Sequence, residues 1–119
     1  MKNAQEITTS LRQFSGTLEY HRWSALFRQV LTDGAKYLAD SAECYWLMDI
    51  IASAQFIQNV SREDFQSWTI KVRNNSAIVT CDDGNGNVVY TQEIEYTDFP
   101  LPECKLFFTD NVILLPSEY

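Results

Sequence analysis

The sequence has few of the residues from which covalent or metal-bound scaffolds are built. Its 119 residues include three cysteines, three prolines, four glycines and one histidine. Three cysteines cannot all pair, and none of them belongs to a Cys-x-x-Cys motif or lies near a group of histidines. The sequence therefore predicts no disulfide framework and no metal site, and it indicates no cofactor. The low glycine and proline content also excludes collagen-like and low-complexity chains.

Long apolar runs are absent as well. The first fourteen residues contain no apolar stretch of the length that a signal peptide needs, and no segment approaches the roughly 20 apolar residues of a membrane span. We therefore expect a cytoplasmic protein that keeps its thiols reduced and has no membrane partner.

The residues that are present favour one ordinary hydrophobic core. Hydrophobic residues make up 45% of the chain and aromatic residues 13%. A chain of this length buries roughly two thirds of its unfolded surface. No internal repeat or linker divides it, so the sequence predicts a single domain over residues 1–119.

The net charge of −7 is unevenly distributed. Residues 1–39 hold five basic and three acidic residues, whereas residues 40–119 hold four basic and thirteen acidic ones. An acidic field repels a nucleic-acid backbone, so direct binding to DNA or RNA is not expected. The acidity serves solubility or, alternatively, mimics the charge of a nucleic acid.

The first half of the chain indicates two helices separated by a short hairpin. Apolar residues at i, i+4 and i+7 predict an amphipathic helix over 3–14, which Gly16 ends. The apolar runs 27–31 and 35–39 flank Thr32-Asp33-Gly34, and Asp-Gly between apolar runs favours a type I′ turn. The sequence therefore predicts a β-hairpin across residues 27–39.

The most apolar segment, residues 43–57, predicts a buried central helix. Asp40 and Glu43 have the spacing of a capping box before it. Its large side chains, each worth about 1.5–3 kcal/mol when fully buried, are expected to dominate stability. They are Tyr45, Trp46, Leu47, Met48, Ile50, Ile51 and Phe56.

The second half has the two-residue period of strands. Residues 65–73, 77–81 and 88–96 read as a meander, with turns at Asn74-Asn75 and at residues 82–87. A last hairpin is expected from 104–109 and 112–115. The predicted class is therefore α+β, with an antiparallel meander of about four to five strands packed on the helices.

Two polar residues of the central helix are candidates for chemistry. Cys44 lies in its first turn, where the helix dipole lowers a thiol pKa, and with His21, the sole histidine, it would form a nucleophile and base pair. Asp49 is the one charge among apolar neighbours and is expected to pair with Arg22, Arg28 or Lys36. Structural roles for both residues remain the alternative.

Two further segments stand out. The run from Glu19 through Tyr20, His21, Arg22 and Trp23 combines the side chains that are favoured at binding surfaces. Trp23 in the core beside a solvated His21 and Arg22 is the alternative. Residues 82–87 are rich in oxygen donors, but strands flank them and valine replaces the glycine of a calcium loop, so a turn is favoured.

The strings GTLEYHRW, TDGAKYLAD, YWLMDIIASAQ, YTDFPL and LLPSEY resemble an uncharacterised bacterial domain family of unknown function, with members in cyanobacterial, plasmid and phage-related genomes. The resemblance covers almost the whole chain. It implies one complete domain and transfers no catalytic residue.

We rank three hypotheses of function on these grounds. The first is a non-enzymatic protein-interaction or regulatory module that binds another protein or a second copy of itself. The second is a small-molecule-binding domain or hydrolase whose pocket, between helix and sheet, joins at least two of Asp49, His21 and Cys44. The third is an acidic inhibitor of mobile-element origin. Its acidic face would comprise Asp82, Asp83, Glu93, Glu95 and Asp98.

Overall fold

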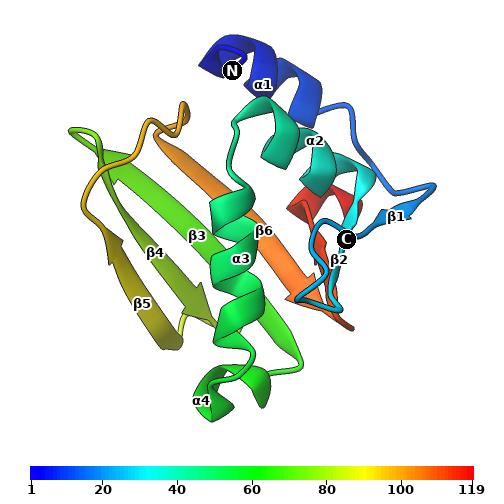
Figure 1. Ribbon diagram of the computed structural model, residues 1–119, viewed down its shortest axis with the longest axis vertical. Helices are drawn as coiled ribbons and strands as arrows, with labels where there is room; N and C mark the ends of the chain where they lie inside the picture. Colours follow the sequence, from blue (N-terminus) through cyan, green and yellow to red (C-terminus); the bar gives the residue numbers. More distant parts are fainter.

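The computed structural model describes residues 1–119 and has an α+β fold. Figure 1 shows the helices on one side of a single sheet, with α3 lying along β3 and β6. The helices are α1 (Ala4–Leu11), α2 (Asp33–Ser41), α3 (Tyr45–Ala54), α4 (Gln58–Ser61) and the short 3-10 helix η1 (Pro116–Glu118). The strands are β1 (Tyr20–His21), β2 (Val30–Thr32), β3 (Phe65–Arg73), β4 (Ser76–Asp82), β5 (Val88–Ile94), β6 (Glu103–Thr109) and β7 (Val112–Leu114).

The sheet is larger than predicted and is mixed. Seven strands are ordered β1-β2-β7-β6-β3-β4-β5, and β2 pairs in parallel with β7 while every other pair is antiparallel. The predicted four to five antiparallel strands are therefore too few. Of the two strands outside the predicted meander, β2 overlaps the first arm of the hairpin predicted over residues 27–39. β1 has only two residues, which is too short to show a two-residue period.

The predicted second-half hairpins are confirmed. Asn74 and Asn75 link β3 to β4, and Asp110 and Asn111 link β6 to β7, all four with φ between 53° and 62°. Positive φ at both central residues is the type I′ geometry, which matches the right-handed twist of the flanking strands. The short polar turn therefore fixes each register.

The hairpin predicted over residues 27–39 is wrong, because its second arm is a helix. The Thr32 hydroxyl accepts a hydrogen bond from the Ala35 amide at 3.2 Å and so caps α2, which begins at Asp33. Gly34 has no positive φ and lies in the first turn of this helix. Thr-Asp-Gly satisfies the rules for a helix start as well as those for a turn.

The central helix is confirmed, but its predicted start and one core residue are wrong. Asp40 belongs to the preceding helix α2, where its carboxylate accepts hydrogen bonds from Lys36 and from the Tyr45 hydroxyl, so no capping box forms with Glu43. The hydrogen bond from Lys36, and to a smaller extent that from Tyr45, lowers the Asp40 pKa below its ordinary value. Phe56 follows the end of α3 and is 84% exposed.

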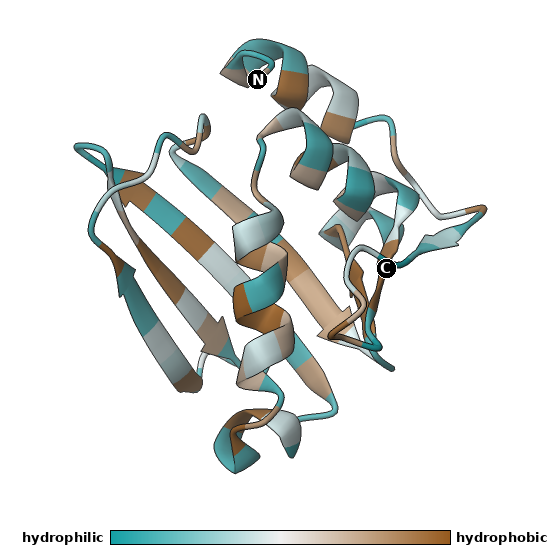
Figure 2. Ribbon diagram, in the orientation of Figure 1, coloured by the Kyte–Doolittle hydropathy of each residue, from teal (hydrophilic) through white to brown (hydrophobic).

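The core lies between the helices and the facing side of the sheet. Trp68 and Ile70 of β3 pack there with Leu47, Met48 and Ile51 of α3. Figure 2 shows the alternation of hydrophilic and hydrophobic residues along the strands that this packing requires. None of the helices combines the length and the apolar content that a membrane span requires.

Candidate metal centre

The register of β1 on β2 brings a histidine to the start of α2. His21 pairs with Leu31, and Tyr20 pairs with Thr32, the residue that caps α2. Because His21 stands at this position, its ring reaches Asp33, which is the first residue of the helix. Residues twelve apart in the chain therefore meet.

Two hydrogen bonds fasten the chain before β1 to the same helix end. The Asp33 amide donates to the Thr17 hydroxyl at 2.8 Å, and the Leu18 amide donates to Asp33 Oδ2 at 2.9 Å. The Thr17 hydroxyl in turn donates to the Glu19 carbonyl at 2.6 Å. These contacts hold residues 17–21 across the first turn of α2.

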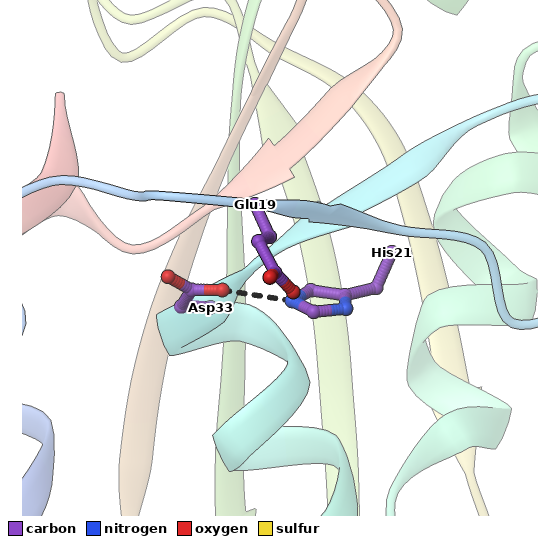
Figure 3. Close-up of side chains that lie close together, drawn as sticks. All are labelled: Glu19, His21 and Asp33. Carbon is purple, nitrogen blue, oxygen red and sulfur yellow. Dashed lines mark hydrogen bonds and ion pairs between the residues drawn. The ribbon is translucent and has the colours of Figure 1, made fainter.

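Glu19, His21 and Asp33 form a cluster of three potential metal ligands (Figure 3). His21 Nε2 lies 2.7 Å from Asp33 Oδ1, and one ligand atom from each residue lies within 4.8 Å of the other two. His21 and Asp33 are half-buried, whereas Glu19 is exposed. The Glu19 carboxylate is directed over the imidazole in Figure 3.

The environment of Asp33 favours its charged form. The hydrogen bond from His21 contributes most, and that from the Leu18 amide follows, so the Asp33 pKa lies below its ordinary value. A carboxylate at the first residue of a helix also faces the positive end of the helix dipole. The cluster therefore offers one nitrogen donor and two oxygen donors.

The predicted binding run from Tyr20 to Trp23 divides between different roles. Tyr20 is exposed, while the Arg22 guanidinium donates to the carbonyls of Ser24 at 3.4 Å and Phe27 at 2.9 Å. Trp23 packs against the core and stacks on Phe27, with ring centroids 6.1 Å apart. Arg22 and Trp23 thus fold the loop after β1.

The folded loop leaves apolar side chains in solvent. The Leu26 amide donates to Ser24 Oγ at 3.0 Å, while the Leu26 side chain is 85% exposed. Leu18, which precedes β1, is 96% exposed, and Tyr20, which lies in β1, is 62% exposed. Residues 18–27, called the contact segment below, combine an ordered backbone with three exposed apolar side chains.

Asp49 is exposed and has a partner other than the predicted basic residues. Its Oδ1 accepts the indole N–H of Trp23 at 2.9 Å, and none of Arg22, Arg28 and Lys36 forms an ion pair with it. Asp49 also lines a cavity of about 290 Å³ between α3 and β5, together with Tyr90 and Gln92. That cavity contains neither His21 nor Cys44.

Cys44 is fully buried and donates a weak hydrogen bond to the Leu38 carbonyl at 3.7 Å. Burial raises its pKa to about 12, which outweighs the lowering expected at a helix start. Burial likewise raises the pKa of Cys81 to about 12 and that of Cys104 to about 11. All three thiols are therefore protonated at neutral pH.

The loop at residues 82–87 closes on itself, as the favoured interpretation expected. Asp83 Oδ1 accepts the amides of Asn85 and Asn87, and Asp83 Oδ2 accepts the Asn87 side-chain amide. Asp82 accepts the Gly84 amide at 2.7 Å. These bonds close the turn, and the one from the Asn87 side chain contributes most to lowering the Asp83 pKa, so this carboxylate stays charged.

A polar cleft of about 500 Å³ lies where β2 and β3 begin and β6 turns into β7. Gln29 is 6% exposed, lines this cleft and makes no side-chain hydrogen bond. Arg28 forms no ion pair there. The remaining lining residues are Gln55, Ser61, Glu63, Asp64, Gln66, Phe108, Asp110 and Asn111.

Sequence patterns identified His21 but not its partner. Asp33 lay in the presumed turn, and its role depends on the helix start and on the pairing of β1 with β2. Gln29 gave no sequence signal, because a lone glutamine is ordinary at a surface. Only the fold shows that it is buried.

The fold and cluster define an α+β domain with helices on one face of a mixed sheet and a histidine–carboxylate site beside its edge strand β1. The chain belongs to the family described as a family of unknown function (DUF6876), whose model matches residues 5–119. The resemblance of the sequence to a domain family of unknown function is thus confirmed. No curated protein sequence matches the chain.

A solved structure has a similar fold. It is described as the crystal structure of the protein of unknown function from Enterococcus faecalis, and it matches with a TM-score of 0.54 at 17% sequence identity. The match covers 85% of this chain and 98% of the other. At this identity the likeness concerns the fold alone.

Proposed function

We propose that the protein is a non-enzymatic interaction module of the cytoplasm and that it binds a protein partner through the contact segment. One observation carries the proposal: hydrogen bonds within residues 18–27 and from Leu18 to Asp33 order this segment, yet the side chains of Leu18, Tyr20 and Leu26 stay exposed. Apolar and aromatic side chains that are held in place before binding lose little conformational freedom when a partner covers them.

The bonds of the loop explain why its tip is preorganised. Arg22 binds two carbonyls of the loop, and Trp23 anchors it to Asp49 of α3. Leu26 therefore occupies a fixed place, as an anchor residue in an interface does. The partner that fits is a protein surface with apolar pockets for Leu18 and Leu26.

The test is affinity capture with surface variants. Immobilised wild-type protein is expected to retain a partner in a fixed molar ratio from extracts of its host cell. Leu18→Glu with Leu26→Glu should weaken retention at least tenfold, because each glutamate would place a charge in an apolar pocket and the loss of a hot-spot anchor costs about 2 kcal/mol. Sedimentation of the same proteins tells self-association from a different partner.

The matched control is Val88→Glu. Val88 is 60% exposed on β5, which is the opposite edge of the sheet from β1. It should retain the partner as the wild type does. Equal retention by all three proteins, or a wild-type protein that stays monomeric and retains nothing, would contradict the proposal.

A second candidate function, small-molecule binding, is supported by the polar cleft. Gln29 lines this cleft and its side chain makes no hydrogen bond within the protein, so its amide is free to bind a ligand. Arg28 beside Asp64 and Asp110 offers charges of both signs. A small zwitterion, with a carboxylate for Arg28 and an ammonium group for the acids, fits this lining.

Thermal melting with each of the twenty free amino acids tests this candidate. A ligand present at 100 times its Kd stabilises by about 2.7 kcal/mol, which raises Tm by several degrees. Arg28→Gln should remove the shift, whereas Arg73→Gln, outside the cleft, should keep it. If no amino acid changes Tm, the cleft does not bind this class.

A further inference from the structure

We propose that Glu19, His21 and Asp33 bind one divalent transition-metal ion of the zinc class. The site is argued from its own geometry and does not depend on the contact segment binding a protein. It lies at the base of that segment, because Glu19 and His21 belong to residues 18–27 while Asp33 belongs to α2.

The distances suit a single ion after small side-chain movements. Ligand atoms that surround a tetrahedral zinc ion at its usual bond lengths lie about 3.4 Å from one another. The three ligand atoms here lie within 4.8 Å of one another. His21 Nε2 and Asp33 Oδ1 are 2.7 Å apart because they share a hydrogen, which the ion would displace to solvent as the two atoms move apart. The Glu19 side chain is exposed and can rotate to bring its carboxylate to this spacing from the other two ligand atoms.

The types of ligand atom determine which class of ion fits the site. An imidazole nitrogen with two carboxylates suits zinc, cobalt and nickel, whereas calcium and magnesium prefer oxygen donors alone. The cysteines do not compete, because Cys44 and Cys81 are buried and all three thiols are protonated at neutral pH. Water would complete the coordination on the exposed side.

The charges of the cluster also call for a cation. Two carboxylates share one imidazole within 4.8 Å, and no lysine or arginine forms an ion pair with either. The Glu19 carboxylate forms no hydrogen bond or ion pair with any side chain. A protonated His21 would neutralise one carboxylate, whereas a divalent ion would neutralise both.

A hydrogen bond from outside the cluster orients one of the proposed ligands. The Leu18 amide occupies Asp33 Oδ2 and so leaves Oδ1 turned toward His21. Such outer contacts commonly fix the orientation of metal ligands. A bound ion would tie the two-residue strand β1 to the first turn of α2, so it would rigidify the contact segment.

The experiment is titration of untagged protein with ZnCl2 by calorimetry, and with CoCl2 by visible absorption and NMR. We expect one ion per chain and a selective change in the NMR signals of His21, the sole histidine. Cobalt should show no thiolate-to-metal charge-transfer band. MgCl2 should give no binding.

Variants separate the proposed site from other carboxylates. His21→Ala and Glu19→Gln should each lower the affinity for zinc at least tenfold. Glu19→Gln is the more secure variant for folding, since the Glu19 side chain holds nothing in place. Glu95→Gln, an exposed acid far along the chain, should bind zinc as the wild type does.

Zinc binding that is unchanged in His21→Ala, a thiolate band with cobalt, or no binding at millimolar zinc would each overturn the proposal. The test of this proposal measures metal binding. The test of the interaction proposal measures retention of a partner, which depends on Leu18 and Leu26. Failure of one is therefore recognised separately from failure of the other.

Discussion

Gln66→Leu is expected to lower the free energy of unfolding by about 3–5 kcal/mol, because it leaves the buried Trp68 indole N–H and the part-buried Glu63 carbonyl without partners at about 1–3 kcal/mol each. Gln66 is fully buried at the start of β3. Its Oε1 accepts the Gln55 amide at 2.8 Å and the Trp68 indole N–H at 3.0 Å.

The other end of the same amide joins the turn between α4 and β3. Nε2 donates to Gln55 Oε1 at 2.9 Å and to the carbonyls of Val60 at 3.0 Å and Glu63 at 3.2 Å. Leucine has a similar volume, so the packing loss is small. The lost hydrogen bonds decide the outcome, since a buried network that is partly satisfied is worse than none.

Chemical denaturation followed by tryptophan fluorescence measures this effect. Gln13→Leu makes the same chemical change at an exposed position in α1's C-terminal flank and should change stability by less than about 0.5 kcal/mol. Equal stabilities for Gln66→Leu and the wild type would show that the amide network contributes nothing.

Gly34→Ala is expected to destabilise the protein by at least about 3 kcal/mol, although alanine is the better helix former by about 1 kcal/mol. A Cβ at Gly34 would lie 2.5 Å from Leu115 Cδ1 and 2.7 Å from Glu118 Oε1. The displaced Glu118 would lose its bonds to the Thr32 hydroxyl, at 2.6 Å, and to the Gly34 and Leu115 amides. Hydrogen bonds to a charged group are worth about 1.5–3 kcal/mol each, so this loss exceeds the gain in propensity.

A double-mutant cycle with Glu118→Ala isolates the cause. Once Glu118 is truncated, Gly34→Ala should cost much less, with Leu115 as the remaining obstacle. Gly16→Ala is the control, since nothing lies within 4 Å of its Cβ position, and it should be neutral. Purely additive effects would mean that Glu118 does not anchor the start of α2.

The parts of the fold that local patterns determine were predicted correctly. The alternation in β3 places Trp68 and Ile70 in the core, and Asn74-Asn75 forms the positive-φ turn that sets the register of β4. The first helix likewise follows from the spacing of its apolar residues, with Ile7 fully buried. In each case the residues that carry the pattern lie within a few positions of one another.

The sequence predicted no metal site, although two of the three proposed ligands lie in the predicted binding run. His21 stood out as the sole histidine beside aromatic and basic neighbours, and Glu19 began the same run. The sequence places Asp33 in a turn, whereas the structure brings it to His21. The sequence also gives no sign that Arg22 bonds the loop after β1. Exposure was equally hard to foresee, since Phe56 resembles a core residue in sequence yet is exposed.

The sequence by itself determined the α+β class, the first helix, the central helix and the antiparallel hairpins of the second half. Only the tertiary structure decided whether Thr32-Asp33-Gly34 would turn a hairpin or start a helix. Local energies permit both, and contacts from about 80 residues away favour the helix: Leu31 pairs with Ile113, and the Glu118 carboxylate accepts the Gly34 amide in the first turn of α2. That choice also brings Asp33 to His21, because the pairing of β1 with β2 sets the distance between them.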